Sequence, residues 1–381
     1  MSTHKYDALL VVSFGGPEGM ADVAPFLENV LRGKNVPRER MLEVAEHYRR
    51  FGGVSPLNAQ NRALIAALRD ELDSHGPRLP IYWGNRNWHP LLPDTLGQMA
   101  ADGVRRALAF FTSAYSSYSG CRQYLENIEQ ARAEVGPAAP RIDKLRTFFN
   151  HPGFIEPMID RTREAIERIP TERSAGVRLA FTAHSIPLAM AQGCRYEPQL
   201  REACRLVAET VGREWELVYQ SRSGPPSQPW LEPDIRDWLR SSKSQSENRL
   251  RRGGQSPLVP DHLAMVPAPQ KGTVPGGSRL GSKMAGASDV VIVPIGFISD
   301  HVEVIYDLDM EAHAICDELG INMVRAATVG THPRFVQMIR ELIVERIDGN
   351  VERPALGTLG PSHDFCPDDC CPSGRPATRP V

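Results

Sequence analysis

Apolar runs of six to nine residues alternate with amphipathic segments along most of this chain, and this alternation constrains its fold more than any other feature. Six runs have the composition of buried strands: residues 8–14, 80–85, 107–113, 177–185, 216–221 and 289–297. Between them, apolar side chains recur at the spacing of a helix face in residues 61–72, 123–135, 155–169 and 198–212. Strands that alternate with helices predict the α/β class, with helices on both faces of a parallel sheet.

The chain has 381 residues, which is enough for two domains with sizeable cores. Residues 144–154 separate two halves of comparable pattern, so we expect two similar lobes at 1–150 and 151–330. A C-terminal helix at 331–353 and a cysteine-containing tail at 354–381 would follow. Ligands in such folds bind at the carboxyl ends of the strands, where the motif-rich segments of this chain lie.

Residues 241–285 interrupt the alternation. They contain five Pro, six Gly and seven Ser, and seven Lys or Arg against two acids give a charge of +5. A segment of this composition cannot bury enough apolar surface to offset its ordering entropy. We therefore expect a disordered insert, with a basic docking loop as the alternative.

Charge and hydropathy narrow the class of partner. The formal net charge of −2 gives no reason to expect nucleic acid, so a small ligand is favoured. The apolar run at residues 8–14 is too short for a secretory signal or a membrane span. We expect a cytoplasmic protein with no transmembrane segment, while peripheral membrane contact and oligomeric state stay open.

A ladder of acids follows the last apolar run. Spacings of three, four and four would place Asp300, Glu303, Asp307 and Glu311 on one stripe of a helix. Like charges at this spacing repel, and residues 298–313 contain no Lys or Arg. The helix dipole favours acids near the helix start, but it does not account for Asp307 and Glu311. A functional ladder is one interpretation, and a solvated helix face is the other.

His184 ends an apolar strand immediately before a Ser-Ile-Pro turn. Taken alone it fits a structural role, but Glu303 also follows an apolar strand, so both side chains could face one cleft. An imidazole opposite carboxylates suits a divalent cation or proton transfer. Residues 48–60 and 112–124 add aromatic and hydroxyl side chains, which suit a flat ligand with carboxylates.

The seven cysteines are unevenly distributed. Cys366, Cys370 and Cys371 cluster near the C-terminus, and clustered thiols in a reducing compartment indicate metal binding rather than disulfides. The others are Cys121, Cys194, Cys204 and Cys316. The last three lie in or beside helical segments, and we expect them to be small core residues.

Seven motifs together resemble those of ferrochelatases in order and approximate spacing. They are SFGGPEG, YRRFGGVSPL, YWGNRNWHP, FTSAYSSYSG, TAHSIP, YQSRSGPPSQPWLEPD and PIGFISDHVEVIYDLDMEA. They cover nearly the whole chain outside 241–285 and the tail. The resemblance is closest to the actinobacterial-type enzymes, which insert ferrous iron into coproporphyrin III. It implies two Rossmann-like lobes, each a doubly wound parallel sheet, with a porphyrin cleft between them.

The resemblance also implies roles for individual residues. His184 and Glu303 would be the catalytic pair and the ligands of substrate Fe²⁺, on opposite sides of the centre of the macrocycle. The porphyrin must be bent and must lose two pyrrole protons, and His184 suits the role of base. The residues implied to form a metal or proton path behind Glu303 are Asp300, His301, Asp307 and Glu311.

Four further positions match porphyrin contacts of the family: Ser55, Tyr124, Tyr48 and Phe14. Phe14 stands where relatives have Tyr or Met beside the metal face, so it has no axial-ligand role. Leu31 stands where some relatives have Arg for a propionate, so the propionate contacts of this chain would differ.

Some ferrochelatases carry a [2Fe–2S] cluster held by one internal cysteine and three tail cysteines. The matching residues are Cys121, Cys366, Cys370 and Cys371. Four thiolates suit [2Fe–2S] or zinc, and unliganded tail thiols are the plain alternative.

Other functions remain open at this stage. A ferrochelatase for protoporphyrin IX differs only in the number of carboxylates on its substrate. A non-catalytic tetrapyrrole or metal carrier would need neither the base nor the acidic ladder. A chelatase for another metal such as cobalt would favour similar ligands, but its other motifs would match poorly.

Overall fold

The computed structural model describes residues 5–33, 36–225, 227–241, 289–349 and 352–374. Apart from Ser241, the predicted insert at 241–285 lies outside the described residues.

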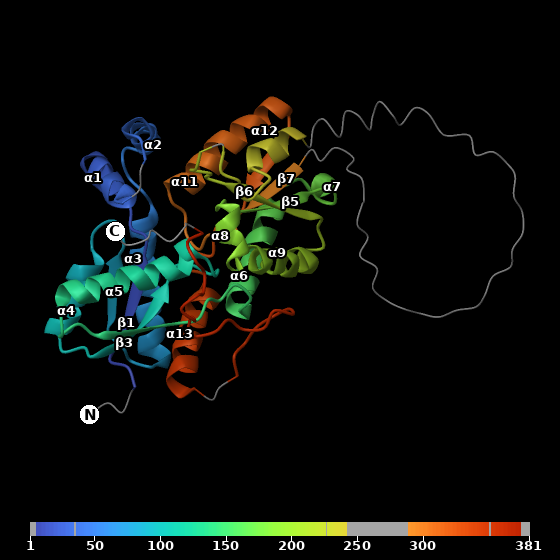
Figure 1. Cartoon of the computed structure of the whole chain (residues 1–381). Coiled ribbons are helices and arrows are strands. Elements are labelled where there is room, and N and C mark those ends of the chain that lie inside the picture. Colours follow the sequence, from blue (N-terminus) through green and yellow to red (C-terminus); the bar gives the residue numbers. More distant parts are fainter. Residues whose placement is uncertain (1–4, 34–35, 226, 242–288, 350–351, 375–381) are drawn as a thin grey trace, which may run out of the picture.

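Two four-stranded parallel sheets form the framework (Figure 1). The first contains β1 (Ala8–Ser13), β2 (Ile81–Asn85), β3 (Arg106–Phe111) and β4 (Arg141–Lys144) in the order β2-β1-β3-β4. The second contains β5 (Arg178–His184), β6 (Trp215–Gln220), β7 (Asp289–Val293) and β8 (Asn322–Arg325) in the order β6-β5-β7-β8. Each sheet places its own second strand first, so the two lobes share one topology. The predicted α/β fold with two similar lobes is confirmed.

All six predicted strands are present, but β4 and β8 were not predicted. Each has four residues, and polar or charged side chains occur in both, in the sequences RIDK and NMVR. Each lies at the edge of its sheet. Edge strands are often short and polar, so they lack the apolar run that identifies a central parallel strand.

Helices connect the strands. In the first lobe they are α1 (Met20–Leu31), α2 (Arg38–Arg50), α3 (Leu57–His75), α4 (Leu92–Ala101), the π-helix η1 (Tyr118–Arg122) and α5 (Gln123–Val135). Then follow α6 (Pro152–Glu167), α7 (Thr171–Ser174), α8 (Leu188–Gln192) and α9 (Tyr196–Val211). After β7 come α11 (Val302–Val304), the π-helix η2 (Ile305–Ala312), α12 (His313–Leu319) and α13 (Pro333–Asp348). The four predicted helices correspond to α3, α5, α6 and α9, and the predicted C-terminal helix is α13.

One apolar core extends across both sheets. Side chains alternate along β1, so Leu9 and Val11 pack on one face while Leu10 packs against α4 and α5 on the other. The same cluster as Leu9 contains Phe181 of β5 and Phe335 of α13. Figure 1 shows α13 between the two lobes. Each lobe therefore has an outer layer of its own and shares an inner layer with the other.

None of the helices in the described ranges combines the length and the apolarity that crossing a bilayer requires.

Candidate functional site

His184 lies at the carboxyl end of β5, where the parallel sheet presents its strand-end side chains. Its Nδ1 lies 2.5 Å from the carbonyl oxygen of Ser185. Because a carbonyl oxygen can only accept, Nδ1 carries the proton, and Nε2 of the neutral ring is left with a free lone pair. Its partner across the strand ladder is Gln220 of β6. The fold thus fixes both the ring and its basic nitrogen.

Glu303 lies on the short helix α11, which begins shortly after β7. Its Oε2 lies 3.7 Å from His184 Nε2, and the two side chains are 49% and 35% exposed. Apolar contact distances are about 3.5–4.0 Å, so a macrocycle cannot fit between two atoms that are themselves 3.7 Å apart. The two side chains are thus in direct contact here, and their position on opposite sides of the centre of the macrocycle stays a prediction.

The acidic ladder continues from α11 into the π-helix η2. Glu303, Asp307 and Glu311 belong to these two consecutive helices, while Asp300 precedes them. The wider turn of a π-helix keeps residues four apart close to one line. The prediction that all four acids share one helical stripe is therefore wrong for Asp300, which lies before the helix. Glu303, Asp307 and Glu311 do follow one another along one side of α11 and η2.

Asp307 is the rung with the most perturbed environment. Burial is the main cause that raises its pKa to about 6, and the charges of Glu303 and Glu311 act in the same direction. The Ser221 hydroxyl donates a hydrogen bond to Asp307 Oδ2, and Gln220 Nε2 donates another at 3.4 Å. Ser221 adopts a φ of 61°, a left-handed conformation that is costly outside glycine. The carboxyl thus exchanges a proton close to neutral pH.

Two arginines from distant parts of the sequence neutralise the ends of the ladder. Arg325 Nη1 lies 2.9 Å from Asp300 Oδ1, and Arg236 Nη1 lies 3.2 Å from Glu311 Oε2. Residues 298–313 contain no Lys or Arg, but basic partners come from β8 and from residues 235–241 instead. An open pocket of about 320 Å³ is lined by Glu311 and Arg236, with Asp237, Arg240 and Ile315. The outer end of the ladder therefore meets solvent.

His301 lies between the strand-end loop and α11. Its ring packs edge-on against Phe297, with centroids 5.0 Å apart. Burial lowers its pKa, while the charge of Glu303 opposes that effect. At neutral pH His301 is consequently uncharged beside the acids.

The first lobe borders this site through α1, α2 and α3. Tyr48 is buried in a cluster that includes Phe26 and Val302, next to Glu303 in the chain. Gln60 Oε1 accepts a hydrogen bond of 2.9 Å from the backbone N–H of Asp300. These contacts bring a predicted porphyrin residue, Tyr48, close to the predicted reaction centre.

A stack of rings adds a further contact between the lobes. His47 of α2 and Tyr306 of η2 are parallel, with centroids 3.8 Å apart. Burial lowers the pKa of His47, which favours the neutral ring in this stack.

Ser55 is 3% exposed, and its Oγ accepts a weak hydrogen bond of 3.4 Å from Leu57 N at the start of α3. A Cβ on Gly16 would meet Ser55 Oγ at 2.8 Å, so the loop after β1 closes tightly over this residue. In this structure Ser55 holds that loop to α3 and does not present its hydroxyl to solvent.

Phe14 and Tyr124 are linked by Arg86, a residue that the sequence analysis did not single out. The guanidinium carbon lies 5.7 Å from the Phe14 ring centroid and 4.6 Å from that of Tyr124. Arg86 Nε donates to Asn127 Oδ1 at 2.7 Å. Phe14 is 36% exposed, whereas Tyr124 is buried. A cation held against rings at the carboxyl end of β2 suits a carboxylate-bearing aromatic ligand.

The four predicted cluster cysteines gather at one place as two close pairs. Cys121 Sγ of η1 lies 4.0 Å from Cys366 Sγ, and Cys370 Sγ lies 3.5 Å from Cys371 Sγ. The hydrogen bond with Cys121 is the main cause that lowers the pKa of Cys366 to about 4, and it raises the pKa of Cys121. A low thiol pKa favours the thiolate, the form that binds metal. The donors fit either four-coordinate metal or a two-iron cluster.

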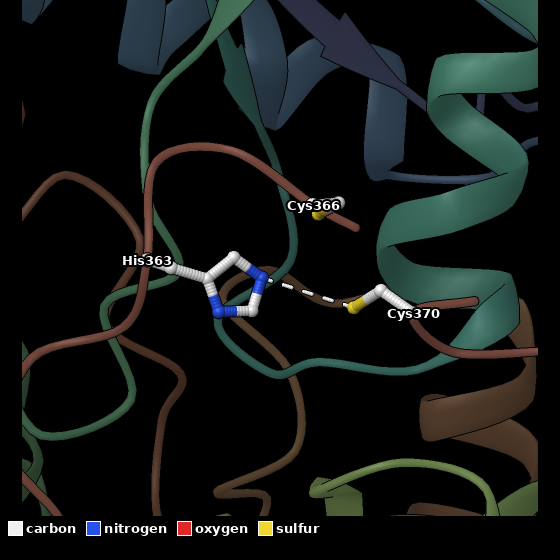
Figure 2. A group of neighbouring side chains, drawn as sticks. All are labelled: His363, Cys366 and Cys370. Carbon is white, nitrogen blue, oxygen red and sulfur yellow. Dashed lines mark hydrogen bonds between the residues drawn. The ribbon is translucent and has the colours of Figure 1, made fainter. Parts of the chain in front are cut away.

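His363 also belongs to this place, and the sequence analysis missed it. Figure 2 shows its ring directed at Cys370, and Nε2 lies 3.7 Å from that Sγ. The donor atoms of His363, Cys366 and Cys370 all lie within 4.8 Å of one another. Cys204 and Cys316 are buried in apolar clusters as predicted, and Cys194 packs against the shared core.

Comparisons with known proteins agree over most of the chain. The family profile named Ferrochelatase matches residues 6–251 and 280–347. A ferrochelatase of Rhodopirellula baltica is 56% identical over 367 residues, which are 96% of this chain and 93% of that relative. A coproporphyrin III ferrochelatase of Streptomyces coelicolor is 47% identical, covering 97% of this chain and 94% of that relative. A relative with the same name from Frankia alni is 48% identical, covering 96% of this chain and 86% of its own length.

Among solved structures, the Bacillus subtilis protein SirB with Fe³⁺ aligns with 91% of this chain and 98% of its own. The TM-score is 0.49 and the identity 10%, a likeness too low to support any assignment.

Proposed function

Since the chain belongs to the ferrochelatase family and inserts ferrous iron into a porphyrin in heme biosynthesis, we propose that His184 and Glu303 form its reaction centre. The observation that supports this most is the pair of facing atoms, His184 Nε2 and Glu303 Oε2, at 3.7 Å. Both come from the carboxyl ends of neighbouring strands, where ligands of open α/β sheets bind. An imidazole nitrogen and a carboxylate oxygen are suitable ligands for Fe²⁺.

Insertion replaces two pyrrole protons by one Fe²⁺, so charge balances when both protons leave. With Nδ1 directed at the Ser185 carbonyl, His184 accepts the first pyrrole proton at Nε2, passes it to Glu303 Oε2 at 3.7 Å and then accepts the second. Glu303 stabilises the resulting imidazolium and is a ligand for the incoming ion. Because the two atoms are only 3.7 Å apart, we infer that both side chains face one side of a bound ring and that protons leave on that side.

The carboxylates beyond Glu303 form the path between this centre and solvent. Asp307, with its pKa of about 6, passes protons on near neutral pH, and Glu311 opens onto the pocket at the surface. His301 borders the path as a neutral ring. Asp300 is held by Arg325, so it positions the loop rather than carrying ions.

The Glu303→Gln variant tests the reaction centre. It keeps the shape of the side chain and removes the charge that pairs with His184 and iron. We expect kcat for Fe²⁺ insertion to fall about 100-fold or more, with the porphyrin Kd unchanged. Glu318→Gln, on an exposed residue of α12, is the matched control. Normal turnover by Glu303→Gln would overturn the assignment.

We propose coproporphyrin III as the porphyrin. The support is the substrate that the names of several relatives state, together with the Arg86 cation, which lies against the Phe14 and Tyr124 rings. Tyr48 and Ser55 border the same side of the first lobe. Because Tyr48 and Ser55 are both buried, they support the residues that contact the porphyrin and do not contact it themselves.

An anaerobic Fe²⁺ insertion assay with coproporphyrin III and protoporphyrin IX in parallel tests the substrate. We expect kcat/KM to be at least about tenfold higher for coproporphyrin III, because its additional carboxylates gain charged hydrogen bonds. Equal or faster turnover of protoporphyrin IX would assign that porphyrin instead. Product from neither would overturn the role of the site.

We propose that the tail holds a [2Fe–2S] cluster. Cys121, Cys366 and Cys370 supply three donors, and both Cys371 and His363 lie within reach of the fourth place. Such a cluster supplies one-electron redox chemistry and ties the tail to η1. Because its thiols need a reducing compartment to stay free of disulfides, we also propose the cytoplasm as its location.

Iron and acid-labile sulfide per chain, with the visible spectrum, test the cluster. We expect two of each, and loss of the visible bands in Cys366→Ser but not in Cys316→Ser, whose thiol lies in the core. A wild-type chain without iron and sulfide would overturn this part.

A further inference from the structure

We propose that Lys144 is the counter-cation of the metal group at the tail, where its ammonium offsets the negative charge of the thiolates that hold the metal. The presence of a metal group there rests on the proposed function. The role of Lys144 does not depend on which metal it is, because a divalent ion or a two-iron cluster held by at least three thiolates has a net negative charge.

Lys144 is a buried cation that has no carboxylate partner in the described part of the chain. It is 6% exposed, and its Nζ donates a hydrogen bond of 3.3 Å to the backbone carbonyl of His363. The adjacent acid, Asp143, is bound to Arg106 instead, and within the described ranges no ion pair joins Lys144 to an Asp or Glu. A buried ammonium is costly unless an opposite charge compensates it. The structure therefore indicates an anion close to this side chain.

The strand directs Lys144 toward the cysteines. Lys144 is the last residue of β4, and because side chains alternate along a strand it shares a face with Ile142. Ile142 packs against the apolar cluster that contains Tyr124 of α5. The π-helix η1, which carries Cys121, runs directly into α5. The ammonium consequently lies where η1 meets the tail segment that contains His363.

The charge of Lys144 acts on three thiols at this place. Hydrogen bonding to Cys121 is the main cause that lowers the pKa of Cys366, and the charge of Lys144 acts in the same direction. Contact with Cys366 raises the pKa of Cys121, and burial raises that of Cys370, while Lys144 opposes both shifts. Because thiolate is the form that binds metal, these groups supply the anion that the buried ammonium requires.

Arg122 provides the contrast. Its Nη1 donates a hydrogen bond of 3.4 Å to the carbonyl of Pro367, so it also joins the first lobe to the tail. Its Nε, however, lies 3.5 Å from Glu126 Oε1, and its side chain is 28% exposed. Its charge is thus balanced by a carboxylate and screened by water. Of these two cations, Lys144 is the one whose charge is left to compensate the metal group.

Co²⁺ added alone to the metal-free full chain tests the role of the charge. Thiolate-to-cobalt absorption reports only ions held by cysteine, and not ions at His184 and Glu303. We expect Lys144→Met to raise the Kd for Co²⁺ about tenfold or more, as is usual when a contact that supports metal ligands is removed. Arg122→Met, the control, should stay within about twofold of wild type.

Lys144→Gln separates the charge from the hydrogen bond, and it also serves if Lys144→Met does not fold. The amide can still donate to the His363 carbonyl, but it carries no charge. We expect its Kd for Co²⁺ to rise as much as that of Lys144→Met. A Kd for Lys144→Gln equal to that of wild type would overturn the proposal, because the side chain would then act through its hydrogen bond alone.

The reduction potential of the chain loaded with iron and sulfide, from a redox titration followed by EPR, is the second readout. Reduction adds a negative charge, so Lys144→Gln should lower the potential by about 59 mV, which is tenfold in the equilibrium constant for one electron. A cluster with an unchanged potential in Lys144→Gln would overturn the role of Lys144 and leave the cluster in place. A chain without iron and sulfide whose Co²⁺ affinity still depends on Lys144 would overturn the cluster and leave Lys144 in place. Absence of thiolate-to-cobalt absorption from the wild type would overturn both.

Discussion

The two lobes share a strand order but present different chemistry at the carboxyl ends of their strands. In the second lobe these ends carry His184 and Ser221, with Glu303 shortly after β7. In the first lobe they carry Phe14 and Arg86, groups that bind rings and carboxylates rather than protons or cations. Topology therefore fixes where a site can form, whereas the side chains at each strand end decide what it does.

This division predicts separate kinetic effects for the two lobes. Changes in the second lobe should lower kcat, since they remove groups used during insertion. Changes in the first lobe should raise KM for the porphyrin, since they remove contacts that stabilise the bound porphyrin and the transition state of insertion equally.

Removal of the base should have the largest effect. We expect His184→Ala to lower kcat about 1,000-fold, because it removes the base whose Nε2 faces Glu303. Porphyrin affinity, measured by fluorescence quenching, should stay within about twofold, a range smaller than one charged hydrogen bond. His313→Ala, on an exposed position of α12, is the control. If affinity fell as much as kcat, the lobes would not divide the work as described.

Loss of packing in the shared core should affect both lobes together. Phe335 of α13 is fully buried in the cluster that contains strands of both sheets. We expect Phe335→Ala to lower the free energy of unfolding by about 3–5 kcal/mol. Thermal unfolding followed by circular dichroism and tryptophan fluorescence should give one coincident transition. Phe365→Ala, at a ring that is 65% exposed, should change little. Two separate transitions would show that the lobes unfold independently.

Removal of the cation in the first lobe should act on binding. We expect Arg86→Met to raise KM for coproporphyrin III about tenfold, the value of one charged hydrogen bond, and to leave kcat within about twofold. Steady-state assays at saturating Fe²⁺ separate the two constants. Arg69→Met, at an exposed position of α3, controls for lost charge. A fall in kcat with unchanged KM would place Arg86 with the second lobe instead.

Much of the fold could be predicted from the sequence, because central parallel strands are continuous apolar runs and their helices carry a clear apolar face. The short edge strands β4 and β8 lack that signal. His184 and Glu303 could be singled out because each follows such a strand. Whether they face one another is a matter of loop geometry, which local sequence patterns do not reveal.

The remaining members of the site depend on contacts that are distant in sequence. Arg325 reaches Asp300 across 25 residues and Arg236 reaches Glu311 across 75, so local charge patterns could not reveal either pair. His363 lies outside the cysteine spacing from which the metal site was predicted, and only the folded tail brings its ring to Cys370. Long-range pairing of this kind is set by packing and not by local sequence.

The smallest predicted effect concerns Asp307 and separates the ladder from the reaction centre. Burial raises its pKa to about 6, so the folded state favours the protonated carboxyl. The resulting stability is present below the unfolded pKa near 3.8 and is lost as the pH rises through 6.

Asp307→Asn cannot ionise and so does not lose this stability. At pH 7.5 its free energy of unfolding should exceed that of wild type by about 1 kcal/mol, allowing for partial exposure. The difference should vanish near pH 4 in urea unfolding experiments. Asp237→Asn, on the outer pocket wall, is the matched control. A lower stability of Asp307→Asn at pH 7.5 would show that the ionised carboxylate is required by the fold.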